Sequence, residues 1–192
     1  GVLRRKVLLV DLDPQGNSTT GLGIPKGEVE NSIYELMIDK APLDKTIIKT
    51  KFKNLYILPA TINLAGIDIE LVERSRQDPT FNKGGQLKKY LDVAKDLFDY
   101  IIIDCPPSLG LITLNAFTAA DSVLIPVQCE YYALEGLGQL INTINLVKKH
   151  LNRTLEIEGA VLTMYDMRTN LSNQVVREVK RYFDDKVYKT VI

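Results

Sequence analysis

Three aspartates that follow strand-like apolar segments are the residues of this sequence best suited to hold a divalent cation. Asp11 and Asp13 end the segment Lys6–Asp13 (KVLLVDLD), and Asp104 ends Tyr100–Asp104 (YIIID). Side chains two positions apart in a strand face the same side, so Asp11 and Asp13 are expected to act together. Hard ions such as Mg²⁺ prefer oxygen ligands of this kind. We therefore expect a magnesium site where these two strands end.

Each aspartate also has a purely structural interpretation, which the sequence leaves open. An apolar strand that ends in Asp104 has the pattern of a Walker B element, whose Asp holds Mg²⁺ in nucleotide hydrolases. Apolar strands that end in Asp at a turn are, however, common, and Asp also caps helices well. Asp11 could be a buried carboxylate bonded to backbone amides. Asp13 precedes Pro14, and the Asp-Pro pair often begins a turn.

The polar stretch after Asp13 is a second candidate for chemistry. Its side chains could contact phosphate or water, or could form a polar loop that leads to a helix cap. The glycine spacing in this stretch fits neither GxGxxG nor GxxxxGK[ST]. The Lys83-Gly84-Gly85 sequence is followed by Gln86-Leu87 and does not follow a strand, so we exclude it as a phosphate loop. The polar residues concerned are Gln15, Asn17, Ser18, Thr19 and Thr20, interspersed with Gly16, Gly21 and Gly23.

Strand-length apolar runs alternate with helix-period segments along the chain. This alternation predicts an α/β fold with a mainly parallel, doubly wound sheet and helices on both faces, in one domain over residues 1–192. In such sheets ligands bind beyond the carboxyl ends of the strands. The expected strands are 6–13, 54–58, 100–104, 122–127, 159–164 and 187–192, and the expected helices are 32–38, 63–75, 86–97, 111–120, 134–151 and 171–183.

The composition excludes several classes of function. The 192 residues include 24 basic and 24 acidic side chains, so any contact with nucleic acid must come from a local patch. No apolar run approaches the ~20 residues that span a bilayer. Cys105 and Cys129 form no CxxC pair, and we expect both to be packing residues. His150 is the only histidine, and no Ser-His or Cys-His dyad can be argued around it.

Taken together, four segments resemble the ParA/Soj branch of the deviant Walker A ATPases. They cover Val7–Gly23, Ile57–Thr61, Tyr100–Leu137 and Leu162–Val176, in the order and with the spacing of that family. The resemblance implies a P-loop NTPase that binds ATP and Mg²⁺ and dimerises around two ATP molecules. It also implies that the ATP-bound dimer binds DNA non-specifically and that a ParB-type partner stimulates hydrolysis.

The resemblance further implies roles for individual residues. Asp13 would orient the attacking water, Asp11 would support the magnesium site, and Asp104 would be the Walker B aspartate that binds the metal. We also assign Met164 to the nucleotide site. The two segments that would sense the nucleotide are Gln15, Gly16 and Asn17, and Pro106, Pro107 and Ser108.

The sequence departs from the family at both ends. The phosphate loop of the family resembles KGGVGKT and is expected one strand and one helix before Lys6, and a Pro-Arg-Asn segment is expected after Ile192. We therefore expect that the chain is truncated at both ends. The full-length protein is expected to hydrolyse ATP, whereas the 192-residue chain alone is expected to be inactive.

The expected partners follow from the same resemblance. Arg168, in a turn after a strand, is the candidate DNA contact, and the basic residues near His150 are more simply explained by the dipole at a helix end. We expect a cytoplasmic, nucleoid-associated protein with no membrane contact. Two alternatives stay open: a MinD-like membrane-associated ATPase of division-site selection, and a non-catalytic ParA-like scaffold.

Overall fold

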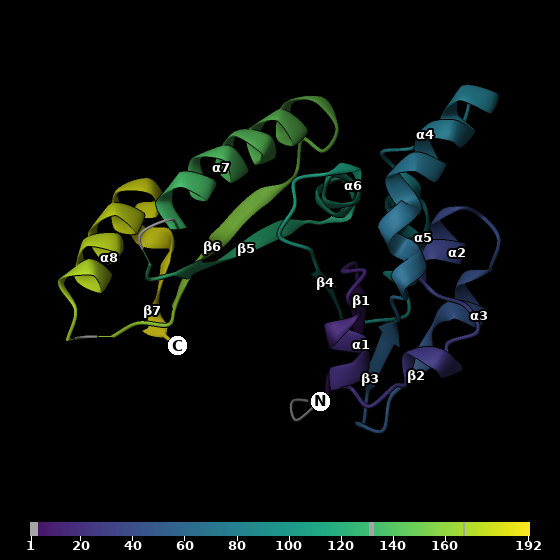
Figure 1. The fold of residues 1–192 in the computed structure, drawn as a ribbon, viewed down its shortest axis with the longest axis horizontal. Coiled ribbons are helices and arrows are strands. Elements are labelled where there is room, and N and C mark those ends of the chain that lie inside the picture. Colours follow the sequence, from purple (N-terminus) through teal and green to yellow (C-terminus); the bar gives the residue numbers. More distant parts are fainter. Residues whose placement is uncertain (1–3, 131–132, 167) are drawn as a thin grey trace. The chain divides into compact units, whose positions relative to one another are not determined.

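The computed structural model describes residues 4–130, 133–166 and 168–192. The chain divides into two compact units, Gly1–Ala119 and Ala120–Ile192 (Figure 1). Each unit has its own parallel strands, so each is described by itself. The prediction of one domain over residues 1–192 stays a prediction.

The first unit is built on a four-stranded sheet with the order β2-β3-β1-β4. Strand β1 (Val7–Asp11) lies between β3 (Leu55–Leu58) and β4 (Tyr100–Asp104) and is parallel to both. The short β2 (Ile48–Lys49) is antiparallel to β3. All three parallel strands consist mostly of Val, Leu and Ile, which favour a strand buried in a parallel sheet.

One face of this sheet forms the core of the first unit. Leu8, Val10 and Leu12 have no exposed surface and pack in one apolar cluster with residues from the surrounding helices. The opposite face is less covered, because Tyr100 and Ile102 of β4 are 58% and 55% exposed. The helical elements of this unit are α1 (Asn17–Gly21), η1 (Lys26–Glu28), α2 (Ile33–Met37), α3 (Leu43–Thr46), η2 (Ile62–Gly66), α4 (Ile67–Gln77), α5 (Gln86–Ala94) and α6 (Leu111–Ala119).

The second unit has a three-stranded sheet with the order β5-β6-β7, in which all pairs are parallel. Gly159 in β6 has φ of +158°, and a Cβ there would lie 2.4 Å from the carbonyl oxygen of Lys186, so only glycine fits. The elements of this unit are β5 (Ser122–Gln128), α7 (Ala133–His150), β6 (Glu156–Thr163), α8 (Asn170–Phe183), η3 (Asp184–Lys186) and β7 (Val187–Val191).

The α/β class with mainly parallel strands is confirmed. Within the first unit the strands form a four-stranded sheet, and within the second unit they form a three-stranded sheet. Helix α1, helix α3 and the antiparallel strand β2 were not predicted. They are five, four and two residues long, respectively, which is too short to carry a readable hydrophobic period.

Candidate functional site

Asp11 and Asp104 lie side by side at the carboxyl ends of β1 and β4. The two residues are register partners in the parallel pairing of these strands. Paired residues of neighbouring strands direct their side chains to the same face of the sheet. The strands stay joined one residue further on, because the backbone N–H of Leu12 donates to the carbonyl oxygen of Asp104 at 2.9 Å.

The carboxylate of Asp11 is fully buried and is satisfied by three donors. Its Oδ2 accepts from the Thr19 N–H at 2.8 Å and from the Thr19 hydroxyl at 2.7 Å, and its Oδ1 accepts from the Asp13 N–H at 3.2 Å. A buried charge is tolerated when it is hydrogen-bonded in this way. Asp11 therefore caps the first turn of α1 from a neighbouring strand, since the N-cap residue Gly16 offers no side chain.

Asp104 is the less buried of the two carboxylates. Its Oδ2 accepts from the Ser18 hydroxyl at 2.5 Å, so consecutive residues of α1 contact the two aspartates. The thiol of Cys105 next to it has its pKa raised to about 12, first by burial and then by the charge of Asp104. Cys105 is therefore a protonated packing group at neutral pH, as the sequence led us to expect.

Asp13 is half-buried and begins a tight turn. Its Oδ1 accepts from the Gln15 N–H at 2.9 Å, and its carbonyl oxygen accepts from the Gly16 N–H at 2.8 Å. Gly16 adopts the left-handed conformation, with φ of 57° and ψ of 38°. This turn leaves the side chains of Gln15 and Asn17 exposed beside the strand ends.

Lys26 also reaches this turn, although sequence reasoning did not include it. Its ammonium donates to the carbonyl oxygen of Gln15, and its Cε lies 2.9 Å from the position of a Cβ on Gly16. The contact spans 11 residues of sequence, and no local motif signals it.

The segment after Asp104 leads from β4 to α6. Pro107 and Ser108 are exposed, and Pro106 is half-buried. The Thr113 hydroxyl donates to the Ser108 carbonyl oxygen at 2.6 Å, and the Leu111 N–H donates to Asp68 Oδ2 at 3.2 Å. These contacts tie the segment to its own helix and to α4.

Met164 and Arg168 belong to the second unit. Met164 follows β6 with φ of 54° and is 64% exposed. The Arg168 guanidinium pairs with the Asp166 carboxylate, with 2.8 Å between Nη2 and Oδ2 and 3.0 Å between Nε and Oδ1. The pairing raises the pKa of Arg168 and lowers that of Asp166, in each case through the hydrogen bonds between them. The Arg168 side chain is 89% exposed.

The donor set at the ends of β1 and β4 fits a magnesium ion that is held partly by other ligands. Within residues 4–130, 133–166 and 168–192, no group of three or more His, Cys, Asp or Glu side chains could hold a metal. Mg²⁺ beside a nucleotide takes only one or two carboxylates and fills its other positions with phosphate oxygens and water. The less buried Asp104, which accepts from the Ser18 hydroxyl, is the candidate for such a carboxylate, whereas the fully buried Asp11 already accepts from three donors.

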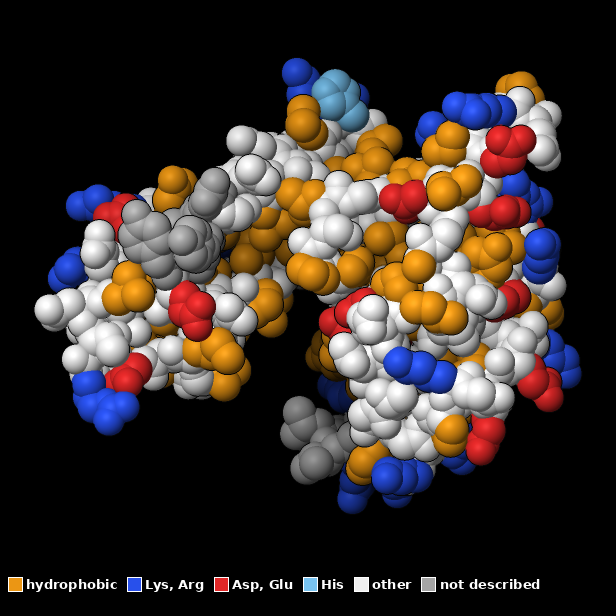
Figure 2. All heavy atoms as spheres, in the orientation of Figure 1, with side chains coloured by type: hydrophobic (Ala, Val, Ile, Leu, Met, Phe, Trp, Pro, Cys, Tyr) orange, Lys and Arg blue, Asp and Glu red, His pale blue; other side chains and the backbone are white. Residues whose placement is uncertain are grey.

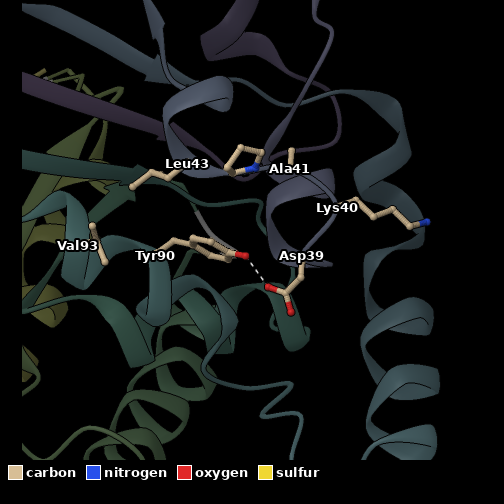
Figure 3. A pocket seen from close by; sticks show the side chains of 7 residues that line it. Asp39, Lys40, Ala41, Leu43, Tyr90 and Val93 are labelled. Carbon is tan, nitrogen blue, oxygen red and sulfur yellow. Dashed lines mark hydrogen bonds between the residues drawn. The ribbon is translucent and has the colours of Figure 1, made fainter.

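A cavity of about 530 Å³ lies elsewhere in the first unit (Figure 3). The Asp39 carboxylate accepts from the Tyr90 hydroxyl and from the Lys89 ammonium, the latter at 2.7 Å. None of the predicted site residues lines this cavity. It is therefore separate from the site at the strand ends, and its lining residues are Asp39, Lys40, Ala41, Pro42, Leu43, Tyr90 and Val93.

Comparisons with known proteins give a consistent result. A family model described as an AAA domain matches residues 2–157. The sporulation initiation inhibitor protein Soj of Bacillus subtilis (strain 168) is 60% identical over 98% of this chain and 72% of that protein. The chromosome partitioning protein ParA of Myxococcus xanthus (strain DK1622) is 49% identical over 98% of this chain and 64% of that protein.

Solved structures agree with these relatives in fold. A crystal structure of cobyrinic acid a,c-diamide synthase from Mycobacterium smegmatis, with a bound ATP analogue and magnesium, matches with a TM-score of 0.86 and 38% identity. The match covers 95% of this chain and 72% of that chain.

Proposed function

This chain belongs to the ParA/Soj family of chromosome-partitioning ATPases, and we propose on that ground that it hydrolyses ATP in DNA segregation. The observation that carries the proposal is the 60% identity to Soj over 98% of the chain. The pairing of Asp11 with Asp104 at the ends of parallel strands supports it, because nucleotides bind at that edge of α/β sheets. The cofactors are ATP and Mg²⁺, and the related synthase structure holds an ATP analogue and magnesium.

Within this site each aspartate has a separate part. Asp104 holds the metal, and Asp11 supports it by fixing α1 and thereby the Ser18 hydroxyl that contacts Asp104. Bound Mg²⁺ would neutralise charge that develops on the phosphate oxygens. Asp13 orients the attacking water: its Oδ1 is held by the Gln15 N–H, so Oδ2 is the oxygen that would accept from water. The chain contributes positioning and charge stabilisation, with no covalent intermediate.

The nucleotide is contacted by the exposed segments beside these aspartates. Their exposed backbone and side-chain groups suit hydrogen bonds to phosphate. Met164 stays a proposed nucleotide contact on the resemblance to the family alone. The proposed contacts are Gln15, Gly16, Asn17, Pro106, Pro107, Ser108 and Met164.

The test is the Asp13→Ala substitution in the longest natural polypeptide that contains this sequence. Loss of water positioning should lower the turnover number about 10²- to 10⁴-fold. Binding of a fluorescent ATP analogue should stay within about twofold of wild type, because the phosphate contacts are elsewhere. Asp96→Ala, which removes an exposed carboxylate at the opposite end of β4, is the matched control and should leave both quantities unchanged.

The outcomes separate the alternatives. Loss of nucleotide binding in Asp13→Ala would mean that Asp13 holds the nucleotide itself. A wild-type protein that binds ATP without turnover would favour a non-catalytic scaffold over an ATPase. None of the helices in the described part of the chain combines the length and the apolar character needed to cross a bilayer.

We also propose that the protein binds DNA, interacts with a ParB-type partner and dimerises when it binds nucleotide. We place it on the nucleoid in the cytoplasm. On the face shown in Figure 2, lysine and arginine side chains are scattered among acidic ones. Arg168 is the proposed contact. Its pairing with Asp166 uses Nε and Nη2, and its 89% exposed side chain can meet a phosphate from solvent.

A further inference from the structure

Asp68, near the start of α4, reaches across to the start of α6. Its Oδ2 accepts from the Leu111 N–H at 3.2 Å, and Leu111 is the first residue of α6. Gly110 packs directly against this carboxylate, because a Cβ there would lie 2.9 Å from Asp68 Oδ2. The contact spans 43 residues of sequence.

The contact gives the first N–H group of α6 a negatively charged acceptor from another helix. The first N–H groups of a helix have no partner within the helix, and a negative charge near them is stabilising. The first turn of α6 contains no acidic residue. Asp68 therefore supplies the anionic cap of α6 from another helix.

The second oxygen of Asp68 points to a further donor. Oδ1 is buried and has no hydrogen-bond partner. A buried carboxylate oxygen without a donor is costly. The segment that joins β4 to α6 lies against this carboxylate at Gly110. Since Pro106 and Pro107 have no N–H, its backbone donors are the N–H groups of residues 108–110.

We infer that Asp68 is a positioning residue for ATP hydrolysis. Its Oδ2 fastens the segment 106–110 to α4 through the Leu111 N–H. Its Oδ1 accepts from an N–H of residues 108–110 when that segment contacts the nucleotide. The inference rests on the proposed function, in which Pro106, Pro107 and Ser108 contact the nucleotide. Asp68 touches neither nucleotide nor metal, and it acts through the backbone of this segment.

Hydrogen–deuterium exchange of the amides in residues 108–114 tests the fastening without any activity. Asp68→Ala should speed exchange there about tenfold or more, since it removes a charged hydrogen bond at the helix start. Asp68→Asn keeps one acceptor for Leu111 and should fall between wild type and Asp68→Ala. Asp44→Ala removes an exposed carboxylate from the first turn of α3 and is the matched control, with no effect on this segment.

Nucleotide measurements on the longest natural polypeptide test the positioning. Asp68→Ala should lower the turnover number about tenfold or more and reduce the preference for ATP over ADP, while ADP affinity stays near wild type. Asp68→Asn should restore part of the turnover, and it serves as the test if Asp68→Ala does not fold.

Three results would overturn the inference. Unchanged exchange in residues 108–114 would show that Asp68 does not fasten the segment. Faster exchange with wild-type turnover would show that the fastening has no part in hydrolysis. Equal loss of ATP and ADP affinity would show a general structural role. A wild-type protein without turnover would instead count against the proposed function, and the exchange measurement would still decide whether Asp68 fastens α6.

Discussion

Thr19 offers the sharpest test of how this site is held together. The side chain is fully buried, and its hydroxyl donates to Asp11 Oδ2 at 2.7 Å and accepts from the Ala60 N–H at 3.0 Å. The hydroxyl thus joins α1 to β1 and to the residues that follow β3. Thr19→Val keeps the shape of the side chain and removes both hydrogen bonds, whereas Thr19→Ser keeps the hydroxyl and removes one methyl group.

The expected magnitudes follow from these two contacts. A hydrogen bond to a buried carboxylate contributes about 1.5–3 kcal/mol, and a buried N–H left without an acceptor, here that of Ala60, costs about 1–3 kcal/mol. Thr19→Val should therefore lower the free energy of unfolding by about 3–5 kcal/mol. Loss of one buried methyl in Thr19→Ser should cost only about 1 kcal/mol.

Urea unfolding followed by circular dichroism measures the difference. The transition midpoint of Thr19→Val should lie about 1 M urea or more below that of Thr19→Ser, given slopes of about 1–3 kcal/mol per molar urea. A valine variant as stable as the serine variant would show that the hydroxyl makes no net contribution. The account of α1 as a helix held by Asp11 would then be wrong.

Three further predictions concern other contacts. The pKa of Tyr90 is raised to about 12 by burial and by Asp39. This pair therefore stabilises the fold below pH about 10 and loses that contribution as the pH rises toward 12. In Tyr90→Phe, the fall in the free energy of unfolding between those two pH values should be smaller than in wild type. Arg168→Ala should weaken DNA binding and reduce the slope of log affinity against log salt by about 0.9, whereas Asp166→Ala should strengthen DNA binding. Fluorescence anisotropy titrations measure both affinities. The same change in affinity for the two variants would exclude a phosphate contact by Arg168. Cys105 should resist thiol reagents at pH 8 until the protein is unfolded, because its thiol pKa is near 12, and rapid labelling of the native protein would contradict its burial.

Much of the first unit could be predicted from local patterns. Strands β1 and β4 are continuous branched apolar runs, and α5 buries Leu87, Leu91 and Ala94 on one face, as its period indicates. Helix α1 could not be predicted, since its residues Asn-Ser-Thr-Thr-Gly have low helix propensity. It forms where the carboxylates of Asp11 and Asp104 receive hydrogen bonds from its first turn.

The sequence by itself determined the α/β class and the aspartates that end two strands, because run length, residue type and spacing are properties of short segments. The family followed from the resemblance of four longer segments. The tertiary structure alone decided that Ser18 and Thr19 serve these aspartates, that Lys26 reaches the turn after Asp13, and that Asp68 caps α6. The hydrogen bond between Ser18 and Asp104 joins residues 86 positions apart. Such partners are chosen by strand register and helix packing, which fix directions and distances that no local pattern contains.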